Sequence, residues 1–148
     1  SKYPLIFLEV IEATCKSSQS SNVDRYLKKK KISFMKIRYP GVCTSAEKIR
    51  NFMLYNQSNC HKNTHLVLYM AARNENIQIL RKYYKKKIIL IDRFIDSTIA
   101  YQHFGFNVDI KFIKIINNRL LKNFKVDFTF LNIVNKSNMF KRLKLRKY

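Results

Sequence analysis

The sequence predicts an α/β fold with three layers, α/β/α, in which helices flank a parallel sheet. Short apolar runs have the length of buried strands at Leu5–Leu8, Ile32–Ile37, Ile88–Ile91 and Phe128–Val134. Longer stretches with helical character separate these runs or follow the last of them, at Lys16–Lys30, Ala46–Leu54, Thr64–Tyr84, Asp109–Phe124 and Ser137–Arg146. Apolar strands that alternate with helices are typical of βαβ units, whose strands pair in parallel.

The composition fits one domain. The chain has 148 residues, of which 47% are hydrophobic, and this is enough for one sizeable core, so we expect a single domain over residues 1–148. No apolar stretch approaches the roughly 20 residues of a membrane span, and we expect no membrane partner. The three cysteines, Cys15, Cys43 and Cys60, have neither disulfide nor metal-ligand spacing. We therefore expect a reducing, cytoplasmic setting.

The net charge of +21 makes a polyanionic ligand plausible without choosing between a nucleotide and a nucleic acid. Lysines cluster at Lys28–Lys31 and Lys85–Lys87, where expected helices end, and lysines there complement the helix dipole. Lysine, asparagine and isoleucine are abundant along the whole chain, which indicates a general compositional bias rather than a binding patch. We do not expect a nucleic-acid partner.

The first strand leads into an incomplete phosphate-binding loop. The pattern G-x-x-x-x-G-K-[ST] uses glycines so that backbone N–H groups can surround phosphates, while Lys reaches the outer phosphates and Ser/Thr holds Mg²⁺. Lys16 and Ser17 are in place, but Val10, Ala13 and Cys15 stand where glycines are wanted. Only two glycines occur in the chain, against roughly ten at ordinary usage of about 7%. By itself, a Lys-Ser pair at a helix start is more often a solvated first turn.

Two further strand ends carry charged side chains. Arg38 follows the second apolar run, and Asp92 and Arg93 follow the third. Because ligands of parallel α/β sheets bind at the carboxyl ends of strands, these side chains and the first loop are expected to form one site.

Five segments of the sequence follow, in order, the motifs of one enzyme family. The most specific is Asp92–Gln102, which matches D-R-[YF]-x-D-S-T-x-A-Y-Q without a gap. The others are L-E-V-I-E-A-T-C-K-S-S-Q at Leu8–Gln19, R-Y-P-G-V at Arg38–Val42, V-L-Y-M-A-A-R at Val67–Arg73 and V-D-F-T-F-L at Val126–Leu131. In these segments the chain resembles the thymidylate kinases, which are nucleoside monophosphate kinases of the P-loop group, over nearly its whole length.

The resemblance implies a P-loop NTPase fold and transfer of the γ-phosphoryl group of ATP to dTMP, which needs positioning and charge neutralisation more than covalent catalysis. On the donor side it implies that Lys16 holds the transferring phosphate, that Ser17 coordinates Mg²⁺ and that Asp92 supports the metal. The loop that would bind the ATP phosphates comprises Val10, Ile11, Glu12, Ala13, Thr14, Cys15, Lys16 and Ser17. The family also implies a homodimer.

On the acceptor side the resemblance implies that Arg38 and Arg93 bind the phosphate of dTMP, with Arg93 and Lys16 as the catalytic residues. Arginine suits this task because its planar fork meets phosphate oxygens bidentately. Arg73 would hydrogen-bond thymine, and Tyr69 would stack near the base from the same helix face. The remaining implied dTMP contacts are Glu12 at the sugar hydroxyl and Ser97, Tyr101 and Gln102 around base and sugar.

The residues alone leave simpler interpretations open. Arg38 is also compatible with an ordinary solvated arginine, and Tyr69 with a core residue on an apolar helical stripe. Asp92 and Arg93 could form an ion pair of little energetic worth. Ser97 lies in a stretch that also has the character of a helix start, where Asp and Ser are common capping residues.

The departures from the family pattern keep two other functions in view. Tyr39 replaces an acid, and the sequence ends at Tyr148, before the arginine-bearing lid and adenine-contacting segment that the family would add. The leading expectation is a dTMP kinase whose acceptor half is better preserved than its donor half. The alternatives are a catalytically impaired nucleotide-binding pseudokinase and a basic nucleic-acid-binding protein.

Restoring Val10, Ala13 and Cys15 to glycine is expected to raise ATP affinity. A non-glycine residue in a left-handed conformation costs roughly 1–2 kcal/mol, so three strained positions correspond to about 10²–10⁴ in affinity. Lys16→Ala in the restored background should remove most of the gain, because Lys16 carries the positive charge of the loop. Calorimetric titration with ATP measures both effects. An unchanged affinity after restoration would mean that the glycines do not limit ATP binding.

Overall fold

The computed structural model describes residues 2–10, 16–39, 41–55 and 60–144, and its centre is a parallel sheet of four strands. The strands are β1 (Leu5–Val10), β2 (Phe34–Arg38), β3 (Ile88–Asp92) and β4 (Phe128–Asn132), in the spatial order β2-β3-β1-β4. All three strand pairings are parallel, as predicted. Asp92, the last residue of β3, pairs with Leu8 on one side and with Arg38 on the other, so the carboxyl ends of these three strands lie together.

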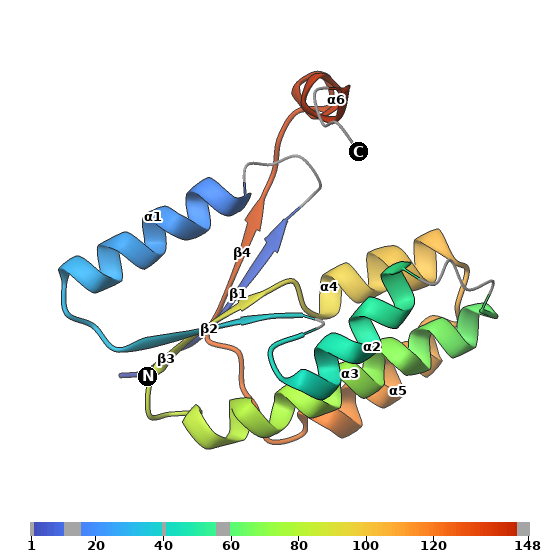
Figure 1. Cartoon of the computed structure of the whole chain (residues 1–148), viewed down its shortest axis with the longest axis horizontal. Helices are drawn as coiled ribbons and strands as arrows, with labels where there is room; N and C mark the ends of the chain where they lie inside the picture. The colour runs from blue at the N-terminus through green and yellow to red at the C-terminus, as the bar shows by residue number, and fades with distance from the viewer. Residues whose placement is uncertain (1, 11–15, 40, 56–59, 145–148) are drawn as a thin grey trace.

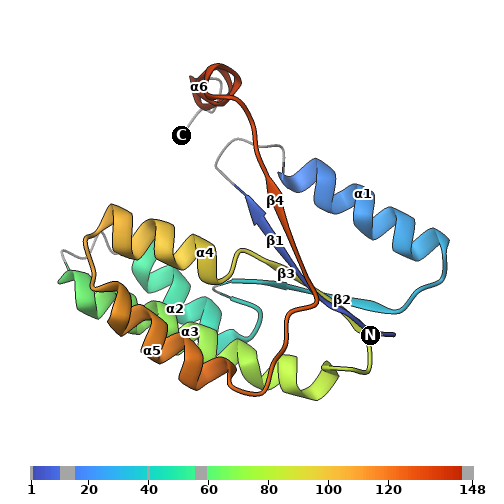
Figure 2. The same ribbon diagram turned by 180° about the vertical axis from the view of Figure 1, so that it is seen from behind.

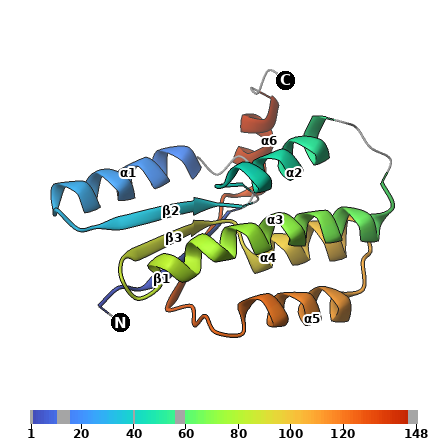
Figure 3. The ribbon, with the colours of Figure 1, turned by 60° about the horizontal axis from the view of Figure 1, so that its bottom comes forward.

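Helices cover both faces of the sheet, which confirms the α/β prediction (Figures 1 and 3). Helix α1 (Lys16–Lys29) lies on one face, and α3 (Lys62–Tyr83) and α5 (Ile110–Leu121) lie on the other. Helix α2 (Thr44–Tyr55) packs against α3. None of the described helices is both long and apolar enough to cross a membrane.

One helical segment was not among the predicted elements. Residues 95–105 form a single turn of α-helix, α4 (Ile95–Thr98), that continues directly into a π-helix, η1 (Ile99–Gly105). The Asp96–Thr98 stretch correctly indicated a helix start, but sequence periodicity does not foresee a widened turn. π-Helical turns are rare and are found mostly at functional sites.

The expected boundaries shift by a few residues. Strand β2 begins at Phe34 rather than Ile32, and β4 ends at Asn132 rather than Val134. The scarcity of glycine has a visible consequence, because left-handed conformations fall on Lys31 (φ 54°), Lys85 (φ 59°) and Asn107 (φ 52°). Lys31 and Lys85 follow the ends of α1 and α3, where glycine is the usual residue.

The start of the phosphate-loop segment corrects one expectation. Val10 is the last residue of β1 and pairs with Asn132, so its backbone is extended and not left-handed. Any backbone strain caused by the missing glycines must therefore come from Ala13 and Cys15. These two residues, with Ile11, Glu12 and Thr14, lie outside the described part of the chain. Helix α1 begins at Lys16, as predicted.

The main core lies between the sheet and α3. Leu5, Phe7, Ile89 and Ile91 project from the two central strands and pack with Leu80 of α3, all nearly inaccessible to solvent. The ring of Phe94 sits edge-on to Phe7, with 4.3 Å between ring centroids, and 5.0 Å from the ring of Tyr39. The core therefore reaches directly into the segment that follows β3.

The edge of the sheet formed by β4 (Phe128–Asn132) is exposed to solvent. Strand β4 is the edge strand next to β1, and Phe128, Phe130 and Leu131 are each more than half exposed. Beyond it, α6 (Lys136–Lys144) stands apart from the other helices in two opposed views (Figures 1 and 2) and buries none of its residues.

A buried carboxylate connects β1 to the turn after β3. Glu9 is 2% exposed, and its two oxygens accept hydrogen bonds from the Phe94 backbone N–H (2.8 Å) and the Ser97 hydroxyl (2.6 Å). Phe94 is the N-cap residue of α4 and its own side chain caps nothing. Glu9 thus accepts from the N–H of the N-cap residue, a donor that in a capping box is satisfied by the third residue of the helix itself.

Glu9→Ala is expected to lower the free energy of unfolding by about 2–5 kcal/mol, because it leaves two buried donors without an acceptor. Glu9→Gln keeps an acceptor for the Phe94 N–H and should cost less than about 1.5 kcal/mol. Urea denaturation of both variants measures the difference. Equal losses for Ala and Gln would show that the negative charge, and not the two hydrogen bonds, is what matters.

Candidate active site

A cavity of about 460 Å³ opens where the ends of β2 and β3 meet α2, α3 and the α4–η1 segment. Six of the eight residues predicted to contact dTMP line it: Arg38, Tyr69, Arg93, Ser97, Tyr101 and Gln102. They come from β2, α3, the turn after β3, α4 and η1, so the fold and not sequence proximity brings them together. The other lining residues are Tyr39, Arg50, Met53, Leu54, His65, Thr98 and Phe106.

Three arginines give the cavity a positive wall. Arg38 ends β2, Arg50 projects from α2, and Arg93 follows β3. No carboxylate is among the described residues that line the cavity, but Glu47 lies next to it, 3.8 Å from Arg38 and 3.6 Å from Arg50. Such a wall can bind a dianionic phosphate through charge-assisted hydrogen bonds.

Arg93 is held by its backbone and by a neighbouring ring. It adopts a left-handed conformation, with φ 62°, and its N–H donates to the Leu8 carbonyl at 3.0 Å. Its guanidinium donates to the Tyr101 hydroxyl at 2.9 Å and lies 5.5 Å from the centroid of the Tyr101 ring. A left-handed non-glycine residue costs free energy and is found mostly at functional sites.

Aromatic and amide groups form the opposite part of the cavity. His65 and Tyr69 occupy one face of α3, four residues apart, and the His65 ring lies 5.3 Å from the ring of Phe106. Gln102, which the π-helix carries, lies 3.4 Å from a His65 ring nitrogen. Flat rings beside amide hydrogen-bonding groups are suited to a nucleobase.

Arg73 lies behind this wall and not in it. Its side chain is fully buried, and its guanidinium donates to Thr98 Oγ1 (2.6 Å), to the Phe94 carbonyl (3.0 Å) and to Asn117 Oδ1. The rings of Tyr39, Tyr69 and Phe94 surround it at 4.6–5.5 Å. Arg73 therefore supports Tyr69 and Thr98, which do line the cavity, and its predicted contact with thymine stays a prediction.

Tyr39 occupies the position at which the family carries an acid. It is 3% exposed, and burial raises the pKa of its phenol, while the nearby Arg73 guanidinium opposes that shift. The group at this position is therefore a neutral hydroxyl under ordinary conditions, and it subtracts nothing from the positive charge of the cavity.

The donor side is described only in part. Asp92 is 4% exposed at the end of β3, beside β1, from which the predicted loop leads to α1. The side chains of Lys16 and Ser17 are outside the described part of the chain, as is Glu12. Among the described residues, no three His, Cys, Asp or Glu side chains form a metal-binding cluster. The roles of Lys16, Ser17 and Asp92 with ATP and Mg²⁺ remain predictions.

Seven of the lining residues were not among the predicted site residues, and four of them show which signals the sequence did and did not carry. Glu47, which pairs with Arg38, and Arg50 lie three residues apart on one face of α2. This helical spacing could have indicated Arg50. His65 lies four residues before Tyr69 and could have been found in the same way. Met53 and Phe106 carry no such signal, because their place depends on how α2 and η1 pack.

Three comparisons with known proteins point to one family. The family model described as thymidylate kinase matches residues 8–148. A thymidylate kinase of Kosmotoga olearia is 34% identical over 114 residues, covering 76% of this chain and 55% of that protein. One from Wolbachia pipientis wMel is 35% identical over 130 residues, covering 85% and 65%. The chain thus spans roughly three-fifths of the length of these curated relatives.

The crystal structure of thymidylate kinase from Ehrlichia chaffeensis superposes with a TM-score of 0.79 at 29% identity, covering 95% of this chain and 78% of that one. The family model and the named relatives agree on one family, and the superposed structure agrees on the fold. The chain belongs to the thymidylate kinase family.

Proposed function

We propose that this chain binds dTMP in the cavity and serves in the transfer of the γ-phosphoryl group of ATP to dTMP, giving dTDP. The observation that carries the proposal is the convergence of six predicted acceptor residues, from separate elements, on one cavity of about 460 Å³. Membership of the family and the relatives named thymidylate kinase support the same activity.

In this proposal the phosphate of dTMP lies against Arg38, Arg50 and Arg93. Three cations there would neutralise its charge and orient one oxygen toward the incoming phosphoryl group. The thymine ring would lie at the other end, near Tyr69 and Phe106, with Ser97 and Gln102 offering hydrogen bonds. Binding the two ends separately positions the acceptor for in-line attack.

ATP and Mg²⁺ belong to the donor side of the proposed site. Oxygen ligands suit Mg²⁺, which commonly takes one or two protein ligands and fills its other positions with water and phosphate oxygens. The buried Asp92 carboxylate at the carboxyl end of β3 fits that chemistry, and Ser17 would be its partner. Lys16 would neutralise the transferring phosphate. A homodimer, which the family implies, is also part of the proposal.

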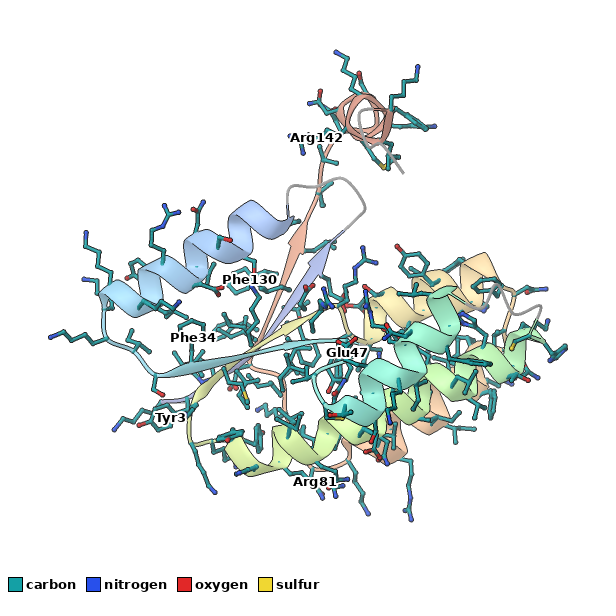
Figure 4. All side chains as sticks on the ribbon, viewed as in Figure 1. Tyr3, Phe34, Glu47, Arg81, Phe130 and Arg142 are labelled. Carbon is teal, nitrogen blue, oxygen red and sulfur yellow. The ribbon has the colours of Figure 1, made fainter. Side chains whose placement is uncertain are left out.

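dTMP at about a hundred times its Kd should raise the melting temperature by about 5–10 °C, the shift that roughly 2.7 kcal/mol of linkage gives for a chain of this size. Arg38→Ala should weaken dTMP about 10–100-fold by removing a charge-assisted contact. Arg81→Ala is the control, since Arg81 lies at the far end of α3 (Figure 4). Equal shifts with UMP or AMP, or none with dTMP, would contradict the proposal.

Turnover is measured by ADP release with dTMP, with dUMP and without an acceptor. The proposal expects release that depends on the acceptor. Acceptor-independent release, or saturable dTMP binding with no release at all, would instead favour the pseudokinase alternative.

Binding of nucleic acid distinguishes the proposed function from the nucleic-acid-binding alternative. If the charge of +21 is a compositional feature, binding of single-stranded DNA should be weak, indifferent to sequence and steeply dependent on salt through counterion release. Fluorescence anisotropy over a salt series measures this dependence. Tight binding that survives about 200 mM salt would favour a nucleic-acid-binding function.

A further inference from the structure

Glu47 contacts both arginines that β2 and α2 contribute to the cavity. Its Oε1 lies 3.8 Å from Arg38 Nη2 and its Oε2 lies 3.6 Å from Arg50 Nη1, so each carboxylate oxygen faces one guanidinium. Figure 4 places Glu47 where α2 meets the strand ends. We propose that Glu47 is a positioning residue for the acceptor phosphate, which holds Arg38 and Arg50 side by side at the cavity wall. The proposal rests on the function proposed above.

The carboxylate of Glu47 occupies space that the glycine at position 41 leaves free. Gly41 has φ 137°, and a methyl group built on its Cα would lie 2.4 Å from Glu47 Oε1 and 2.7 Å from Glu47 Cδ. Glu47 also sits in the first turn of α2, where its N–H donates to the Cys43 carbonyl at 2.9 Å. The absence of a side chain at Gly41 therefore creates the space that the carboxylate fills.

Two opposed electrostatic effects decide the sign of the contribution. A carboxylate near the site repels a phosphate dianion, but the side chain of Glu47 is 38% exposed and water screens that repulsion. The side chain of Arg38 is 53% exposed and that of Arg50 is 27% exposed, so without a partner both would sample many rotamers and repel each other. Each ion pair with Glu47 involves one terminal nitrogen of the arginine. The other N–H donors of the same guanidinium group are left to bind phosphate. We expect the ordering of the two cations to outweigh the screened repulsion.

The test is calorimetric titration of the whole chain with dTMP and with thymidine, which lacks the phosphate. Glu47→Gln should weaken dTMP about three- to tenfold, as expected for two partly exposed ion pairs, and leave thymidine unchanged. Glu75→Gln is the matched control, since it makes the same charge change on α3, a helix that carries none of the three cavity arginines. It should leave both ligands unchanged.

Gly41→Ala tests the position of the Glu47 carboxylate by changing the glycine beside it instead of the carboxylate itself. It should displace the Glu47 carboxylate and weaken dTMP by a similar factor, and in the Glu47→Gln background it should add little, as for two changes that act through one contact. Where Gly41→Ala fails to fold, Glu47→Gln against Glu75→Gln decides alone. dTMP bound by Glu47→Gln as tightly as by wild type, or more tightly, overturns the positioning role. A wild-type chain that does not bind dTMP overturns the proposed function itself.

Discussion

The hydrogen bonds of Glu9 are the constraint on which the site depends. One buried carboxylate of β1 accepts from Phe94 and Ser97, residues 85 and 88 positions away in sequence. It thereby fixes the turn after β3, in which Arg93 is left-handed and the Phe94 ring packs between Phe7 and Tyr39. The same turn starts the α4–η1 segment, which lines much of the cavity. A change at Glu9 would therefore move the core and the site together.

Arg73 extends this arrangement to the helices. Its buried guanidinium bonds to the Phe94 carbonyl and Thr98 from the turn, and to Asn117 from α5, while its own backbone belongs to α3. Burying a cation is costly unless other groups replace its hydration. In this protein three neutral oxygens bind its two terminal nitrogens, and three aromatic rings surround the group, because aromatic faces attract guanidinium groups. The cation thus ties three elements to the wall of the cavity.

Much of the fold was predictable because its signals are local. Apolar runs bounded by helical stretches identify the four strands, and the gapless Asp92–Gln102 motif supplies five of the residues that line the cavity. The burial of Arg73 was not predictable, because the acceptors that satisfy its charge come from α4 and α5 and no local pattern marks them. The π-helix was missed because apolar periodicity does not distinguish its wider turns from those of an α-helix; it carries Tyr101 and Gln102, which line the cavity.

The two halves of the proposed site use different kinds of contact. The cavity uses side chains such as Arg38 and Arg93. A chain that is rich in lysine, asparagine and isoleucine can still carry these arginines. A phosphate-binding loop uses backbone N–H groups, which reach phosphate through conformations that glycine permits most readily. A chain with two glycines in 148 residues can keep the first kind of site intact. In the second kind of site, as proposed for the segment before α1, the side chains of Lys16 and Ser17 would have to supply the contacts. One of the two glycines, Gly41, lies instead beside the cavity, where it leaves room for Glu47.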